Sequence, residues 1–177
     1  FAVGAAKLAS RQVLVNELPA VEGLARVDLI CLDKTGTLTI GEIGFDAAHP
    51  LAPVDGWQDA LAWYAASPDA NATARAMRDE YPVGDVTLDA TGYIPFSSAR
   101  KWSAVSFAAP HSDDPARRTA GTWVLGAPEM IFGDAATSPA SAFGRTVTEL
   151  AETGRRTLVL ARTDEPITEA DIEAERL

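Results

Sequence analysis

The sequence has few of the residues from which small proteins build metal centres and covalent crosslinks. Among its 177 residues there are one cysteine and two histidines. A single cysteine excludes an internal disulfide and a cysteine-cluster zinc site, and two distant histidines disfavour a histidine-based metal site. Uninterrupted apolar runs are short as well. None reaches the roughly 18–20 residues that are needed to span a bilayer.

Basic residues are in the minority. The chain has 15 basic and 25 acidic residues, a net charge of −10. Because an acidic chain repels phosphate backbones, we expect no nucleic acid partner. Lysine is especially rare, with three against twelve arginines, and alanine is abundant, a bias typical of the GC-rich genomes of actinobacteria. The 47% hydrophobic content nevertheless indicates an ordinary soluble globular chain of one domain, or one domain and part of another.

The first part of the chain has the pattern of a helix followed by a buried strand. Residues 16–25 predict a helix with Pro19 in its first turn. Residues 27–32 (VDLICL) predict a strand buried on both faces of a parallel sheet. One strand cannot form a sheet, so we expect its neighbours elsewhere in a longer parent protein. The start at Phe1 and the end within an acidic helical pattern also favour a fragment.

The remainder alternates between helical and strand patterns. Helices are predicted at residues 58–66, 70–80, from Pro128 onward, 143–152 and 168–176, and strands at 92–96, 101–107, 122–125 and 156–162. Asp69 is the expected N-cap of the second helix. Residues 40–45 form a glycine-containing connection and a plausible hinge. The expected fold class is therefore α/β with α+β character, an antiparallel sheet flanked by helices.

The motif that carries chemistry is DKTGTLT at residues 33–39. A fixed seven-residue string arises by chance in such a chain with a probability of roughly 10⁻⁷. The carboxylate of Asp33 can attack the γ-phosphoryl group of ATP to form an aspartyl-phosphate. Gly36 permits a tight turn, and its backbone N–H groups with the Thr35 and Thr37 hydroxyls can bind an anion. Mg²⁺ is needed to neutralise the transferring group.

These residues resemble the signature of the P-type ATPases, which lie within the haloacid-dehalogenase-like phosphotransferases. The resemblance implies catalytic roles for Asp33, Lys34, Thr35 and Thr37, with Mg²⁺ at Asp33 and Thr35. The phosphatases of that superfamily have a second Asp two residues after the nucleophile as acid/base, where this chain has Thr35. Without it the acyl phosphate is hydrolysed slowly, which suits a pump.

The resemblance continues along nearly the whole chain. Residues 18–31 look like the segment that leads from the fourth membrane helix into the phosphorylation domain. The later matches are 96–101 (FSSARK) to F-S-x-x-R-K, 126–129 (GAPE) to K-G-A-P-E, and 154–158 (GRRTL) to G-x-R-x-L. The pattern is most similar to the cation-transporting ATPase E type of actinobacteria. It implies that residues 1–41 hold the membrane-helix linker and the first, helix–strand piece of a Rossmannoid phosphorylation domain, and that 42–177 are a nucleotide-binding domain truncated at its end.

By the same resemblance, ATP contacts a defined set of residues. Phe96 stacks on adenine, which contributes about 1–3 kcal/mol. Lys101 lines the pocket, and Arg156 pairs with phosphate oxygens. The full cofactor-binding set is Phe96, Ser98, Lys101, Gly126, Ala127 and Arg156. From the residues alone other roles stay open. Phe96 can be a core residue, Arg156 a surface partner of Glu152, and the small residues Gly126 and Ala127 can admit a second backbone instead of a ligand.

The chain departs from the family pattern at two positions of the nucleotide site and in its extent. Leu125 stands where the family has Lys before G-A-P-E, and the acidic residue common in the helix at 70–80 has only Asp69 and Asn71 as candidates. Both changes predict a modest affinity for ATP. The later phosphorylation motifs, T-G-D and G-D-G-x-N-D, do not occur in this sequence.

The expected function is ATP binding and part of the phosphorylation region of a membrane-embedded cation pump, with Ca²⁺ as the ion favoured by subgroup. This part would lie on the cytoplasmic side, soluble and inactive by itself. Its partners would be nucleotide and the rest of the pump: the remaining phosphorylation domain, the actuator domain and the membrane helices. Two alternatives remain open. One is a Mg²⁺-dependent phosphatase with a cap domain, and the other a non-enzymatic nucleotide-sensing module.

Overall fold

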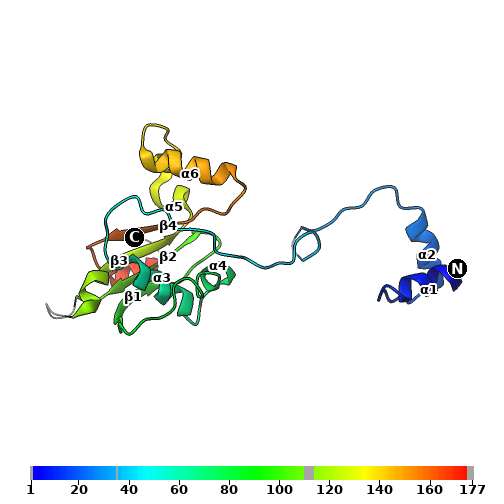
Figure 1. The fold of residues 1–177 in the computed structure, drawn as a ribbon, viewed down its shortest axis with the longest axis horizontal. Coiled ribbons are helices and arrows are strands. Elements are labelled where there is room, and N and C mark those ends of the chain that lie inside the picture. Colours follow the sequence, from blue (N-terminus) through cyan, green and yellow to red (C-terminus); the bar gives the residue numbers. More distant parts are fainter. Residues whose placement is uncertain (1, 35, 110–113, 175–177) are drawn as a thin grey trace. The chain divides into compact units, whose positions relative to one another are not determined.

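The computed structural model describes residues 2–34, 36–109 and 114–174. Internal contacts divide the chain into two compact units, Phe1–Glu42 and Ile43–Leu177 (Figure 1). None of the helices within the described ranges is both long enough and apolar enough to span a bilayer.

The first unit consists of two short helices and an extended segment. Helix α1 (Ala2–Ala9) contacts helix α2 (Leu18–Ala25), and a Cβ atom at Gly4 would lie 3.1 Å from Val21 Cγ1. Helix α2 has Pro19 in its first turn and confirms the helix predicted there.

The strand predicted at residues 27–32 is not formed. These residues have no regular secondary structure, and their apolar side chains are exposed, with Leu29 at 76% and Ile30 at 72%. A strand of a parallel sheet is stable only when neighbouring strands accept and donate its backbone hydrogen bonds. The described part of this unit offers residues 27–32 no such neighbour, so the apolar pattern alone does not produce a strand.

The second unit contains a four-stranded sheet in which every pair of neighbours is antiparallel. Its strands, in sheet order, are β1 (Ala90–Ile94), β2 (Trp102–Phe107), β3 (Gly121–Gly126) and β4 (Val159–Thr163). This order confirms the four strands and the antiparallel sheet predicted from the sequence. The register pairs Trp102 with Gly126 and Gly126 with Val159. The end of β1, the start of β2, the end of β3 and the start of β4 therefore share one end of the sheet.

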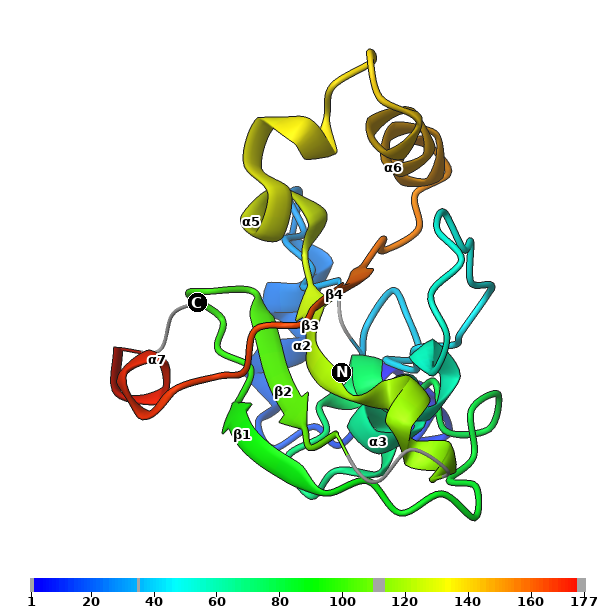
Figure 2. The ribbon, with the colours of Figure 1, turned by 90° about the vertical axis from the view of Figure 1, so that its left-hand side faces the viewer.

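Helices flank this sheet as predicted. They are α3 (Trp57–Ala66), α4 (Ala72–Arg75), α5 (Pro128–Phe132), α6 (Ala142–Glu152) and α7 (Glu169–Ala174), with 3₁₀ turns η1 (Pro115–Thr119) and η2 (Gly133–Ala136). Helices α5 and α6 lie together beyond the sheet end at which β3 finishes and β4 begins (Figure 2).

The helix predicted at residues 70–80 is much shorter in the structure. Helix α4 has one turn, and Asn71, not Asp69, is its N-cap, because Asn71 Oδ1 accepts a hydrogen bond from Ala74 N at 2.9 Å. Turns follow α4, and the guanidinium of Arg78 donates to the carbonyl of Ala65 at 2.9 Å. The backbone N–H groups of Met77 and Arg78 donate to carbonyls three positions back, as in 3₁₀ turns, so the α-helical bonding pattern ends there.

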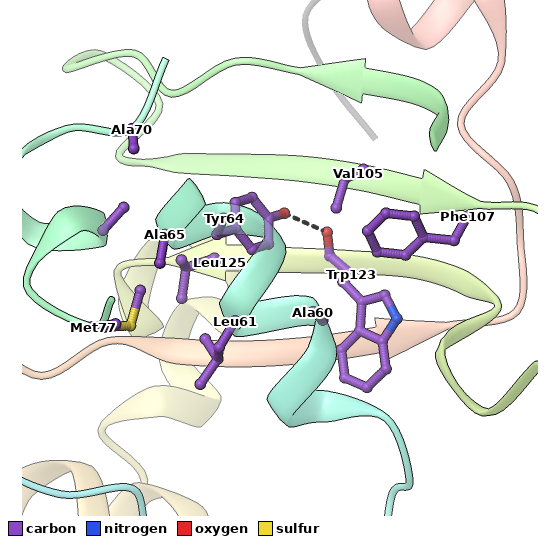
Figure 3. Close-up of a cluster of buried hydrophobic side chains, with 11 residues drawn as sticks. Ala60, Leu61, Tyr64, Ala65, Ala70, Met77, Val105, Phe107, Trp123 and Leu125 are labelled. Atoms are coloured by element: carbon purple, nitrogen blue, oxygen red, sulfur yellow. Dashed lines mark hydrogen bonds between the residues drawn. The ribbon is translucent and has the colours of Figure 1, made fainter. Parts of the chain in front are cut away.

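The main core lies between α3 and one face of the sheet. Tyr64 and Trp123 lie at its centre, with 3% and 2% of their surface exposed. The hydroxyl of Tyr64 donates to the carbonyl of Trp123 at 2.7 Å, the bond drawn in Figure 3. Burial raises the pKa of the Tyr64 phenol, so the hydroxyl stays protonated and remains a donor. The indole Nε1 of Trp123 donates to the carbonyl of Thr119 at 2.7 Å, which leaves both polar groups of this core bonded.

The opposite face of the sheet has a smaller core and a set of hydrogen bonds between polar groups. Ser106 Oγ and Thr122 Oγ1 lie 2.5 Å apart on neighbouring strands, and Ser106 Oγ also accepts from Ile167 N at 2.8 Å. Thr122 Oγ1 in turn donates to the carbonyl of Glu165 at 2.5 Å. These bonds hold the segment after β4 against the sheet, and Ile167 packs with Ile94, Ala104 and Val124.

Candidate functional site

The described residues of the DKTGTLT motif, Asp33, Lys34 and 36–39, form an exposed turn. Asp33 is exposed, and the carbonyl of Lys34 accepts hydrogen bonds from the backbone N–H groups of the residues that follow, Thr37 at 3.4 Å, Leu38 at 2.9 Å and Thr39 at 3.2 Å. Gly36 has a φ of +74°, a left-handed conformation that favours glycine. The turn thus has the backbone geometry expected for this glycine. Thr35, predicted to act in catalysis and in metal binding, lies outside the described residues.

The donors near Asp33 fit a Mg²⁺ ion only in part. Among the described residues, no group of three His, Cys, Asp or Glu side chains comes together. Mg²⁺ in phosphotransfer sites is typically held by one or two carboxylates together with the phosphates of the substrate. Asp33 supplies one exposed carboxylate, which suits an ion that arrives with the phosphates of ATP.

The six predicted nucleotide contacts all lie at one end of the sheet. Phe96, Ser98 and Lys101 belong to the connection from β1 to β2, and Gly126 ends β3 with Ala127 following it. Arg156 lies three residues before β4 begins. Because all neighbouring strands are antiparallel, these connections share an end of the sheet. Positions that are 60 residues apart in the sequence are thereby gathered into one region.

Two of these connections are joined by a backbone hydrogen bond. Ala127 N donates to the carbonyl of Lys101 at 3.0 Å, and Lys101 N donates to the carbonyl of Ser97 at 2.8 Å. Lys101 has a φ of +62°, which is uncommon for a residue with a side chain. Phe96 is 42% exposed, so its ring is accessible to a ligand and does not belong to the buried core.

Gly126 is required by the close approach of another backbone. A Cβ atom there would lie 2.4 Å from Trp102 Cβ and 2.6 Å from the carbonyl oxygen of Lys101. Of the two roles that the sequence left open for this glycine, contact with a second backbone is therefore present in the structure.

We expect Gly126→Ala to destabilise the chain by about 1–3 kcal/mol, because the added methyl group overpacks the junction between β2 and β3. The measurement is chemical denaturation followed by far-UV circular dichroism. Gly84→Ala is the matched control, since a Cβ atom added there would have no described atom within 4 Å, its chain neighbours apart. Equal stability of the two variants would contradict this role of Gly126.

A groove of about 670 Å³ lies within the second unit. Segment 43–54, α3, α4, α6 and β4 contribute to its walls, which include Trp57, Met77, Trp123, Leu150 and Leu158. Of the six predicted nucleotide contacts, Arg156 lines this groove, and the other five, Phe96, Ser98, Lys101, Gly126 and Ala127, do not. Leu125, which stands where the family pattern has Lys, also lines the groove and contributes an apolar side chain to its wall.

Two adjacent arginines at this groove have different partners. Arg155 Nε pairs with Asp46 Oδ2 at 2.8 Å, and both side chains are more than half exposed, so the pair adds little stability, about 0–1 kcal/mol. Arg156 Nη1 donates to Thr73 Oγ1 at 2.9 Å. The partner of Arg156 thus comes from α4, a different element from the Glu152 that the sequence offered. Nothing in the sequence pattern marks Thr73 as functional.

Comparison with known proteins identifies relatives along nearly the entire chain. The chain is 39% identical over 175 residues to the calcium-transporting ATPase CtpE of Mycolicibacterium smegmatis, covering 97% of this chain and 20% of that protein. It is 39% identical over 166 residues to the probable cation-transporting ATPase exp7 of Streptococcus pneumoniae, covering 91% and 19%. A stretch of 55 residues is 46% identical to the plasma membrane ATPase of Kluyveromyces lactis. No family model and no solved structure matches the chain.

The sequence motifs, the antiparallel sheet with its flanking helices and these relatives agree on one class. The chain is a segment of a P-type ATPase. Within that class it is similar to the mycobacterial CtpE proteins, with 41% identity over 167 residues to that of Mycobacterium tuberculosis. The chain spans about a fifth of the length of these relatives.

Proposed function

We propose that this chain provides the ATP-binding part and the start of the phosphorylation region of a cation-transporting P-type ATPase. In this proposal residues 1–41 lead into the phosphorylation domain and 42–177 bind nucleotide. The observation that carries it is the gathering of six motif-matched positions at one end of one sheet, in a chain whose relatives are named cation and calcium transporters. The contact boundary between Glu42 and Ile43 supports the division.

The proposed reaction begins at Asp33. A carboxylate oxygen of Asp33 attacks the γ-phosphorus of ATP, the bond from that phosphorus to the β,γ-bridging oxygen breaks, and ADP leaves. Lys34 and the Thr37 hydroxyl offer positive charge and a donor beside the transferred group. Mg²⁺, when bound, neutralises the phosphate charge. Because this chain has Thr35 in place of a second Asp, the aspartyl-phosphate is expected to persist long enough to drive a conformational cycle.

The names of the relatives support a proposal for the transported ion and for the location. The names of the CtpE proteins favour Ca²⁺, and those of the plasma membrane ATPases favour the cell membrane as the location of the parent protein. We propose that this part lies on the cytoplasmic side, where ATP is available. It would work with the rest of the phosphorylation domain, the actuator domain and the membrane helices, in which ion ligands are expected.

Titration of the 177-residue chain with ATP tests this proposal. Trp57 and Trp123 line the groove and Trp102 adjoins Lys101, so tryptophan fluorescence is a suitable signal. We expect saturable binding with a dissociation constant in the micromolar to millimolar range. Lys101→Ala should raise this constant, and Phe96→Ala should raise it roughly 5- to 150-fold through the loss of stacking.

The matched control for this titration is Met130→Ala. Met130 is 46% exposed on α5 and matches no nucleotide motif, so its removal should leave the dissociation constant for ATP unchanged. If Phe96→Ala and Lys101→Ala bind ATP as tightly as the unchanged chain, those two residues do not belong to the nucleotide site.

A further inference from the structure

A hydrogen bond across the groove links two residues that are far apart in the sequence. Thr73 lies in α4 and Arg156 in the connection between α6 and β4, 83 positions later, and Arg156 Nη1 lies 2.9 Å from Thr73 Oγ1. Both residues line the groove of about 670 Å³. The bond therefore sets the direction of a cationic side chain at the wall of this groove.

The two neighbouring arginines differ in what they can still bind. Arg155 is paired with the carboxylate of Asp46, which compensates its charge. Thr73 is neutral, so its hydroxyl occupies one of the five N–H donors of Arg156 and leaves the positive charge in place. The remaining N–H groups of Arg156 keep the planar geometry that binds phosphate oxygens in pairs. Of the two, Arg156 is the one suited to an anionic ligand.

A partner that fixes the side chain of an arginine lowers the entropy cost of binding an anion. The long arginine side chain has many rotamers, and binding an anion with one of them requires the loss of the others. Thr73 is well placed to reduce that loss. Its helix is anchored by the Asn71 cap and by the buried side chain of Ala74, so the hydroxyl of Thr73 is held by a fixed segment of backbone.

We infer that Thr73 is a positioning residue, which orients the guanidinium of Arg156 toward the phosphate groups of a bound nucleotide. This inference rests on the proposed function, since it names the part of the ATP site that recognises phosphate. It implies that Thr73 contributes to the binding of ATP and ADP and not to that of adenosine.

The test compares Thr73→Val with Thr73→Ser in the 177-residue chain, with ATP, ADP and adenosine as probes. Valine has the shape of threonine without the hydroxyl, whereas serine keeps the hydroxyl. We expect Thr73→Val to weaken ATP and ADP about 2- to 10-fold, the scale of one hydrogen bond, and to leave adenosine unchanged. Thr73→Ser should bind all three as the unchanged chain does. In an Arg156→Ala background, Thr73→Val should cause no further loss.

The outcomes separate this inference from the proposed function. Failure of the unchanged chain to bind ATP overturns both. ATP binding that Thr73→Val leaves unchanged overturns the inference alone, and so does an equal weakening of ATP and adenosine, which would indicate a structural role. Thr73→Ala serves as a second hydroxyl-free variant if Thr73→Val does not fold, with the thermal midpoint of each variant as the check. An additive loss in the Arg156→Ala background also overturns the inference.

Discussion

Replacing Asp33 by Asn in the full-length protein should abolish the phosphoenzyme and ATP-driven ion transport. An amide nitrogen or oxygen cannot take the place of the carboxylate as the nucleophile, and loss of a nucleophile lowers kcat by roughly 10⁴- to 10⁶-fold in well-studied enzymes. Asp33 is exposed at the start of the turn and is not part of a packed core, so the change should leave folding intact. The measurement is acid-stable labelling of the protein by γ-labelled ATP.

Asp28→Asn is the matched control for this experiment. Asp28 lies in the same exposed, irregular segment five residues earlier, so its substitution changes the charge equally and should leave the labelling unchanged. ATP binding to Asp33→Asn should also persist, since the proposed contacts to nucleotide belong to the other unit. Undiminished labelling of Asp33→Asn would show that this carboxylate is not the phosphorylated group. A nucleotide-sensing module, in contrast, would keep its role in this variant.

Trp123→Ala should be the most destabilising single substitution among those considered. Truncation of a buried tryptophan costs about 3–5 kcal/mol, a large part of the roughly 5–15 kcal/mol that stabilises a typical domain. Trp123 is 2% exposed, and loss of its ring would leave a cavity that faces α3. The substitution would also remove the hydrogen bond from its Nε1 to the Thr119 carbonyl. Urea denaturation followed by far-UV circular dichroism measures the change in unfolding free energy.

Phe96→Ala is the control for the loss of an aromatic ring. Phe96 is 42% exposed, so we expect its truncation to cost less than about 1 kcal/mol, close to the range of surface substitutions. The same measurement shows that the Phe96→Ala chain used for ATP titration is folded. If Phe96→Ala destabilised the chain as much as Trp123→Ala, the packing described around the two rings would be wrong.

Local sequence patterns predicted most of the secondary structure of the second unit. The four strands and helices α3, α5 and α6 follow from alternation, helical periodicity and proline positions, which act over a few residues. Two predictions failed for reasons that lie outside those windows. Residues 27–32 are apolar enough for a strand but have no neighbouring strand in the described part of their unit. After α4 the backbone continues in turns, and the guanidinium of Arg78 bonds to the end of α3.

The candidate site was predictable to a similar extent. Its motif-bearing residues could be named from the sequence, because short strings such as DKTGTLT and FSSARK have a fixed spacing. Thr73 could not be named, since its partner Arg156 is 83 residues away and no motif includes it. The position of Leu125 in the wall of the groove likewise depends on which distant segments pack against β3.

The sequence by itself indicated the class of this protein, the P-type ATPases, and predicted its chemistry, with Asp33 as the carboxylate nucleophile and a threonine where the phosphatases have their acid. Those properties depend on residue identity at short spacing. Only the tertiary structure decided that Gly126 is needed for a close backbone approach, and that Arg155 pairs with a carboxylate whereas Arg156 bonds to a neutral hydroxyl. Such properties depend on strand register and on contacts between distant segments, which the order of residues along the chain does not reveal.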